Sequence, residues 1–147
     1  SALDNSESRI KLLRENCDRM RVTCATLGQA DTTAIGKYDR VLVDVPCSNT
    51  GVMRRRLDLR WRLSPGGTKR LADEQLKLLT QAATHTKLAG QLVYSTCSIE
   101  AEENEQLVAR FLETHPGWGL ASERSLHPVE DHTDGAYAAR LTRQAKK

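Results

Sequence analysis

The chain is constrained most by two short apolar segments, each of which leads directly into a polar turn that carries a cysteine. Residues 41–45 read VLVDV and have the β-branched composition of a strand that is buried on both faces. Residues 92–94 read LVY and form a second apolar strand. Apolar residues at helical spacing between the two segments predict a crossover helix, so the strands should lie parallel. This pattern predicts an open α/β sheet.

Polar residues gather where these two strands end. Asp44 and Cys47 stand at the carboxyl end of the first strand, and Pro46 fixes its own φ and keeps the residue before it extended. Cys97 follows the second strand and precedes an acidic helix start at residues 100–105. Open α/β sheets carry their chemistry at the carboxyl ends of their strands. Asp44, Cys47 and Cys97 are therefore the first candidates for catalysis.

The remaining elements follow from turn residues and apolar spacing. Residues 1–4 are typical of the end of a strand, and residues 21–25 are typical of a complete one. Gly90 is expected to close the longest helix. The pattern predicts helices over residues 5–20, 71–89 and 102–113, and a final antiparallel pair of strands over residues 118–120 and 137–141.

Size and charge set bounds on this fold. The 147 residues suit a single domain, and an apolar content of 39% is enough for one core. Lysine and arginine exceed aspartate and glutamate by 22 − 19 = 3, so the chain is only mildly basic. A nucleic-acid partner must therefore be argued from local clusters of charge. One cluster follows the first cysteine turn and comprises Arg54, Arg55, Arg56, Arg60 and Arg62.

Metal sites and membrane segments are not expected from the sequence. The four cysteines show no CxxC spacing, which argues against zinc and against a disulfide framework. The histidines are typical of loops rather than of metal ligands. No apolar segment approaches the ~20 residues of a membrane span, so we expect a cytoplasmic protein without a membrane partner.

Three motifs in the chain resemble those of one protein family. Residues 44–55 (DVPCSNTGVMRR) and 92–105 (LVYSTCSIEAEENE) are similar to the two cysteine motifs of the Nop/Sun-type RNA cytosine-carbon-5 methyltransferases. Residues 133–141 (TDGAYAARL) are similar to the last hairpin of that family. The resemblance covers essentially the whole chain. It implies a Rossmann-like class I methyltransferase fold, S-adenosylmethionine as the cofactor, and RNA, in particular rRNA, as the substrate.

The resemblance also implies the catalytic roles. Carbon 5 of cytosine is too weak a nucleophile to accept a methyl group directly, so a thiolate must first add to carbon 6. In the family the cysteine of the Thr-Cys motif is this nucleophile and the cysteine of the Pro-Cys motif assists product release. These roles carry over to Cys97 and Cys47. Asp44 would hydrogen-bond the edge of the cytosine.

Three aspartates are implied to hold the cofactor. Asp4 matches the acidic residue that binds ribose hydroxyls after a strand of a Rossmann-like fold, and Asp31 matches the contact to the adenine amino group. Asp44 belongs to the same site. The simpler alternatives are a helix cap for Asp4 and a solvated loop for Asp31.

The arginine cluster is implied to bind RNA phosphates beside an unpaired or flipped cytosine. Arg54, Arg55, Arg56 and Arg60 are the candidates, because they directly follow the Pro-Cys turn. The alternative is a solvated loop in a mildly basic protein.

One part of the family pattern is missing from the chain. The first strand and its glycine-rich turn should lie ~20 residues upstream of Asp4, whereas the first glycine of the chain is Gly28. We therefore expect residues 1–147 to be a single, partial catalytic domain that is inactive alone and binds the cofactor weakly. Two alternatives remain: a methyltransferase-like remnant that binds RNA without catalysis, and a thiol-redox protein, in which the arginine cluster and Asp44 would have no purpose.

Overall fold

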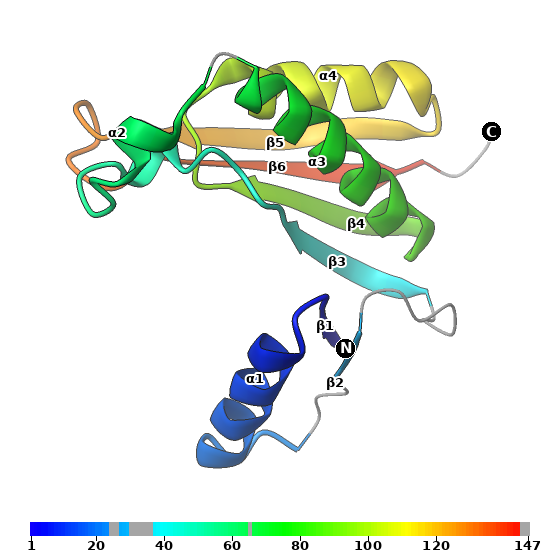
Figure 1. The fold of residues 1–147 in the computed structure, drawn as a ribbon. Coiled ribbons are helices and arrows are strands. Elements are labelled where there is room, and N and C mark those ends of the chain that lie inside the picture. The colour runs from blue at the N-terminus through cyan, green and yellow to red at the C-terminus, as the bar shows by residue number, and fades with distance from the viewer. Residues whose placement is uncertain (24–26, 30–36, 65, 145–147) are drawn as a thin grey trace. The chain divides into compact units, whose positions relative to one another are not determined.

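The computed structural model describes residues 1–23, 27–29, 37–64 and 66–144 (Figure 1). Contacts within the chain divide it into two compact units, Ser1–Gly36 and Lys37–Lys147. Each unit is described by itself. The second unit carries both cysteine turns and the arginine cluster, so most of the candidate site belongs to it.

The N-terminal unit is a strand–helix–strand element. β1 (Ala2–Asp4) leads into α1 (Glu7–Arg19), and β2 (Leu27–Gln29) returns parallel to β1. The strand end expected at residues 1–4 and the helix expected after it are both confirmed.

The strand predicted at residues 21–25 is wrong as far as Thr23, and the rest of it lies outside the described residues. Arg21 and Val22 instead form the turn that caps the C-terminus of α1. Val22 N donates to Cys17 O at 2.8 Å, and Arg21 has a φ of 55°. These are the features of a left-handed helix cap, here with arginine in place of the usual glycine. β2 therefore begins later than predicted.

The second unit is built on a four-stranded sheet with the order β3-β4-β6-β5. β3 (Tyr38–Asp44) runs parallel to β4 (Thr86–Thr96). β6 (Ala136–Arg143) is antiparallel to both β4 and β5 (Trp118–Leu126). The parallel pair of strands that lead into the cysteine turns and the antiparallel final pair are thus both confirmed.

Two helices of this unit cover one face of its sheet (Figure 1). α3 (Gly67–Thr84) connects β3 to β4, and α4 (Glu105–Thr114) connects β4 to β5. Among the described residues, three shorter helical segments lie in the connections: η1 (Thr50–Val52), α2 (Leu59–Arg62) and η2 (Ala101–Glu103).

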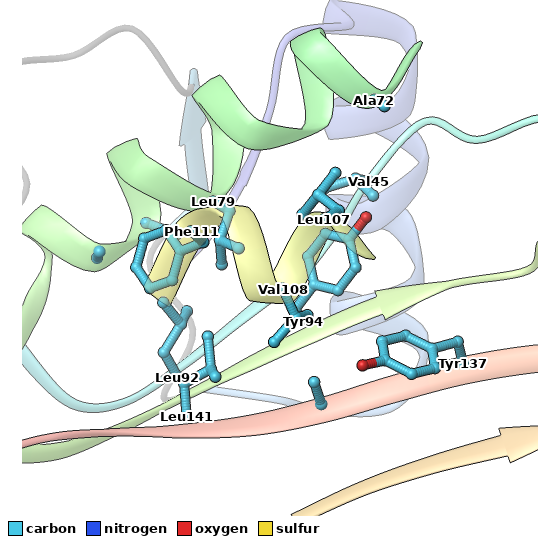
Figure 2. Close-up of a cluster of buried hydrophobic side chains, with 13 residues drawn as sticks. Val45, Ala72, Leu79, Leu92, Tyr94, Leu107, Val108, Phe111, Tyr137 and Leu141 are labelled. Carbon is cyan, nitrogen blue, oxygen red and sulfur yellow. The ribbon is translucent and has the colours of Figure 1, made fainter. Parts of the chain in front are cut away.

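The core lies between these helices and the sheet (Figure 2). Val41 and Val43 of β3 pack against it, whereas Leu42 between them is 67% exposed. The prediction that residues 41–45 are buried on both faces is therefore wrong, because the strand alternates between a covered and an open face. The largest apolar side chains with no exposed surface are Leu79, Leu92, Tyr94, Leu107, Phe111 and Leu141.

The helix predicted over residues 71–89 ends earlier, at Thr84, and β4 already begins at Thr86. Gly90 lies within β4, where the pairing with β3 shifts its register. A Cβ atom on Gly90 would lie 2.8 Å from the carbonyl oxygen of Lys87. Gly90 therefore permits a tight bulge in a strand and does not end a helix, as was predicted for it.

The one-sided core predicts unequal costs for two matched substitutions. Leu92→Ala removes a side chain with no exposed surface and should lower the free energy of unfolding by about 2–5 kcal/mol, because it leaves a cavity. Leu42→Ala makes the same deletion on the open face and should change that free energy by less than about 0.5 kcal/mol. Urea denaturation followed by circular dichroism measures both values. Equal losses would contradict a core on one face of the sheet.

Candidate active site

The two candidate cysteines lie side by side. β3 and β4 are parallel with Asp44 opposite Ser95, so the turns that follow them leave the same edge of the sheet. Cys47 and Cys97 stand in these turns, and their sulfur atoms are 3.1 Å apart. Cys47 is buried, whereas Cys97 is partly exposed. The fold thus brings together two thiols that are 50 positions apart in the sequence.

The two thiols have different surroundings. Burial is the main cause that raises the pKa of the Cys47 thiol, and the hydrogen bond with Cys97 raises it further. The Cys97 thiol donates a hydrogen bond to Asn49 Oδ1 at 2.9 Å. Asn49 Nδ2 in turn donates to the carbonyl oxygen of Cys47 at 2.7 Å. Cys47 is therefore held as a neutral thiol at neutral pH, next to the more accessible Cys97.

A buried carboxylate holds both cysteine turns in place. Glu103 has no exposed surface, and its Oε1 accepts hydrogen bonds from Ser48 N and Gln75 Nε2, each at 2.9 Å. Its Oε2 accepts hydrogen bonds from the hydroxyls of Ser48 and Ser98. These two serines directly follow the two cysteines. One side chain thus ties both turns to each other and to α3.

Asn104 holds the second cysteine turn through the residues on either side of Cys97. Its amide nitrogen donates to Ser98 O at 3.0 Å, and its amide oxygen accepts a hydrogen bond from Thr96 Oγ1 at 2.7 Å. Asn104 separates η2 from α4, so the helix predicted from residue 102 begins at Glu105 instead and is otherwise confirmed.

Two glycines bring a third segment to the cysteine turns. Gly51 N donates to Cys97 O at 3.1 Å, and Gly135 N donates to Gly51 O at 2.8 Å. A Cβ atom on Gly51 would lie 2.6 Å from the carbonyl carbon of Gly135 and 2.9 Å from Cys97 O. A Cβ atom on Gly135 would lie 2.6 Å from Ile99 Cγ2. The turn before β6 is therefore packed directly against the first cysteine turn.

The three candidate aspartates have different settings. Asp44 is exposed at the end of β3 and accepts a hydrogen bond from a serine of β4 at 3.1 Å. Asp4, at the end of β1 in the N-terminal unit, accepts hydrogen bonds from Ser6 N at 2.7 Å and from Arg9 Nε at 3.0 Å. Asp4 therefore binds the segment that leads into α1, but the N-cap of this helix is Ser6, so Asp4 is not the helix cap of the simpler alternative. Asp31 lies outside the described residues.

Two arginines of the cluster are bound to one aspartate. Arg54 Nε and Arg55 Nε lie 2.6 Å from Oδ1 and Oδ2 of Asp134, in the turn before β6. The hydrogen bond from Arg54 is the main cause that lowers the pKa of Asp134, so this carboxylate is charged at neutral pH. Exposed ion pairs of this kind are weak. Asp134 therefore orients both arginines, and a competing anion could replace it as their partner.

The rest of the arginine cluster includes an exposed tryptophan that the sequence analysis did not single out. Arg60 and Trp61 are exposed in α2, and Trp61 is 89% exposed. Arg56 lies 3.9 Å from Asp58, which is a long ion pair. The side chain of Arg62 lies outside the described part of the chain. Arginines beside an exposed aromatic ring are typical of surfaces that bind single-stranded nucleic acid.

Three further residues of the site carry little signal in the sequence. Glu103 belongs to an acidic segment that suits a helix start equally well. The usable signal is the serine after each cysteine, because buried hydroxyls need an acceptor. Asn49 stands in a turn where asparagine tolerates left-handed backbone, and Asp134 forms an Asp-Gly pair that is typical of any turn.

Other features of the described residues add little to the site. These residues contain no group of three or more His, Cys, Asp or Glu placed to hold a metal ion. No helix among them is long and apolar enough to cross a membrane. An open hollow of about 570 Å³ along α3 is lined by Gly66, Lys69, Arg70, Asp73, Glu74 and Lys77.

The Glu103 network predicts that the shape of this side chain matters more than its charge. In Glu103→Gln the amide oxygen still accepts from Ser48 N and Gln75 Nε2, while the amide nitrogen donates to the two hydroxyls, which rotate to accept. In Glu103→Leu the buried donors lose their acceptor, which should lower the free energy of unfolding by about 2–4 kcal/mol. Urea denaturation compares the variants. The prediction fails if glutamine costs as much as leucine.

Comparison with known proteins shows that this chain is similar to ribosomal RNA methyltransferases. The family described as 16S rRNA methyltransferase RsmB/F matches residues 1–142. A probable ribosomal RNA small subunit methyltransferase B of Bacillus subtilis (strain 168) is 36% identical over 122 residues, which cover 79% of this chain and 27% of that protein. The ribosomal RNA small subunit methyltransferase B of Vibrio cholerae is 36% identical over 154 residues, which cover 97% and 36%.

A solved structure gives the same result for the fold. NSun6 from Pyrococcus horikoshii, crystallised with SFG, superposes with a TM-score of 0.86 at 26% identity, over 99% of this chain and 41% of that one. The chain spans roughly a third of the length of the curated relatives it matches. The Rossmann-like class I methyltransferase fold expected from the sequence is confirmed. The chain belongs to the 16S rRNA methyltransferase RsmB/F family, which is of the Nop/Sun type.

Proposed function

We propose that the protein transfers a methyl group from S-adenosylmethionine to carbon 5 of a cytosine in RNA, through a covalent adduct with a cysteine. The observation that carries this proposal is the 3.1 Å contact between Cys47 Sγ and Cys97 Sγ at one edge of the sheet. Two adjacent thiols suit a reaction that first makes and then breaks a carbon–sulfur bond. The proposed substrate is ribosomal RNA, in keeping with the family.

Cys97 is the proposed nucleophile. Its sulfur adds to carbon 6 of the cytosine, and the electrons of the double bond between carbons 5 and 6 make carbon 5 nucleophilic. Cys47 is poorly suited to attack, because burial raises the pKa of its thiol and cysteines react as thiolates. Once carbon 5 has taken the methyl group, a base takes the proton on carbon 5, the electrons of that bond restore the double bond between carbons 5 and 6, and the bond between carbon 6 and Cys97 breaks with its electron pair on the Cys97 sulfur. Cys47 is proposed to assist this release.

Three aspartates are proposed to hold S-adenosylmethionine, which supplies the methyl group. The family depends on this cofactor, and the solved NSun6 carries SFG, an analogue of it. Asp4 suits the ribose hydroxyls, because its carboxylate stands at the end of β1 and makes its contacts to Ser6 and Arg9 through Oδ1. Asp31 would bind the adenine amino group. Asp44, exposed at the end of β3, would face both the cofactor and the edge of the cytosine.

Arg54, Arg55, Arg56 and Arg60 are proposed to bind phosphates next to the target cytosine. Each of them is exposed, and their segment directly follows the Pro-Cys turn. The cytosine must leave its stack to reach Cys97, so its neighbours in the RNA are also unstacked. The exposed ring of Trp61 offers such a neighbour a surface on which to stack.

Substitution of the two cysteines separates their proposed roles. Cys47→Ala should leave RNA bound to the protein as a denaturation-resistant adduct, because the reaction stalls after the carbon–sulfur bond has formed. Cys97→Ala should give neither adduct nor methylated RNA, because nothing starts without the nucleophile. Cys17→Ala, in α1, is the matched control and should behave as wild type. Denaturing gel mobility of the full-length protein, or of this chain complemented by the missing half of the domain, with substrate RNA and S-adenosylmethionine measures the adduct.

The reverse pattern, with an adduct in Cys97→Ala but not in Cys47→Ala, would exchange the two assignments. An absence of adduct and methylation in every form, with RNA still bound, would favour the remnant that binds RNA without catalysis.

Asp134 provides a test of the RNA surface. Asp134→Asn removes the charge that binds Arg54 and Arg55, so RNA affinity should rise. The dependence of log affinity on log salt should steepen by up to about 1.4–1.8, since each of the two new phosphate contacts contributes about 0.7–0.9. Asp39→Asn makes the same change beside Lys87 and is the matched control. Fluorescence anisotropy with a labelled RNA measures both; equal effects would indicate a general charge effect and no local site.

A further inference from the structure

One side chain contacts both cysteine residues. Asn49 Nδ2 donates to the carbonyl oxygen of Cys47 at 2.7 Å, and Asn49 Oδ1 accepts the hydrogen bond of the Cys97 thiol at 2.9 Å. Asn49 is partly buried between the two turns. Its backbone has φ 60° and ψ 23°, in the left-handed region, directly before η1. Neither of these contacts follows from the sequence motifs.

The orientation of this amide is fixed by its partners. A carbonyl oxygen can only accept, so Cys47 O must face the NH₂ end of the Asn49 side chain. The oxygen end must then face Cys97. As an acceptor, this oxygen binds a thiol and has no hydrogen to offer a thiolate.

Because each thiol carries one hydrogen, the donor in the hydrogen bond between the two sulfur atoms can be assigned. The Cys97 thiol has one hydrogen, and it is directed at Asn49 Oδ1. The 3.1 Å contact to Cys47 must therefore use the hydrogen of Cys47. The thiols form a directed chain in which Cys47 donates to Cys97 and Cys97 donates to Asn49. The burial of Cys47, which keeps it a thiol, agrees with its place as the donor.

We propose that Asn49 is a positioning residue for Cys97, an inference that rests on the proposed role of Cys97 as the nucleophile. Asn49 holds the resting Cys97 thiol in one orientation and leaves the Cys97 sulfur free to accept the hydrogen of Cys47. When the partly exposed Cys97 gives its proton to solvent water, the bond to Asn49 is lost and the bond from Cys47 remains. The thiolate is then stabilised by Cys47 and no longer tied to the turn, so it is free to approach carbon 6.

A simpler role for Asn49 would be to tolerate a left-handed turn, as asparagine and glycine both do. Asn49→Gly separates the two roles, because glycine keeps this backbone conformation and removes the amide. Ala89→Gly is the matched control, since Ala89 also has a positive φ, of 58°, but lies near the other end of β4 from Cys97. Both variants add one glycine to the unfolded chain.

The test combines kinetics with infrared spectroscopy on the full-length protein. In Asn49→Gly, kcat for RNA methylation should fall at least about tenfold, because the Cys47 carbonyl loses its bond to Asn49 Nδ2 and Cys47 is no longer held toward the Cys97 thiolate, with KM for RNA and the thermal unfolding midpoint unchanged. The S–H stretching band of Cys97, obtained by subtracting the spectrum of Cys97→Ala, should move to higher frequency, because the thiol no longer donates to an amide. Ala89→Gly should match wild type in all four measurements.

An unmoved S–H band, or an unchanged kcat with a moved band, would overturn the inference. Its failure is distinguishable from failure of the proposed function. If Cys97→Ala still methylates RNA, the proposed role of Cys97 fails, and the infrared band alone decides whether Asn49 holds its thiol. A moved band in that case supports the contact, and an unmoved band overturns it.

Discussion

The buried carboxylate of Glu103 is the interaction on which the geometry of the site depends. A carboxylate without solvent contact is costly unless its oxygens accept hydrogen bonds, and its donors here come from α3 and from both cysteine turns. Gln75, one of these donors, also binds the carbonyl oxygen of Pro46, which immediately precedes Cys47. The turns therefore cannot separate without leaving a buried charge unsatisfied. Correct placement of the two thiols is thus part of folding.

The elements that position the site could be predicted because their signals are local. Apolar runs at residues 41–45 and 92–94, each followed by a cysteine turn, indicated two parallel strands and therefore one common edge. The roles of Cys47 and Cys97 were predicted from the family motifs, because the spacing of apolar residues carries no information about catalysis. The arginine cluster was equally visible, because its members are neighbours in the sequence.

The errors arose where distant residues decide a local feature. Arg21 takes a left-handed cap that sequence rules assign to glycine, so a strand was predicted too early. Gly90 resembles a helix stop, and only its pairing with β3 shows that it permits a bulge. Glu103 was assigned to the start of a helix. Its bond to Ser48 joins residues 55 positions apart, so the local sequence does not reveal it. Charge and burial of this kind depend on tertiary structure, which a window of sequence does not contain.

The contact between Gly51 and Gly135 has a mechanical consequence. The backbone of Gly135 packs so closely against Gly51, in the first cysteine turn, that neither residue has room for a Cβ atom. The preceding residue, Asp134, binds Arg54 and Arg55. The arginine surface proposed to bind RNA and the edge that carries the thiols are therefore joined through the contact between Gly51 and Gly135, so a shift of the turn before β6 would also shift the backbone beside Cys47.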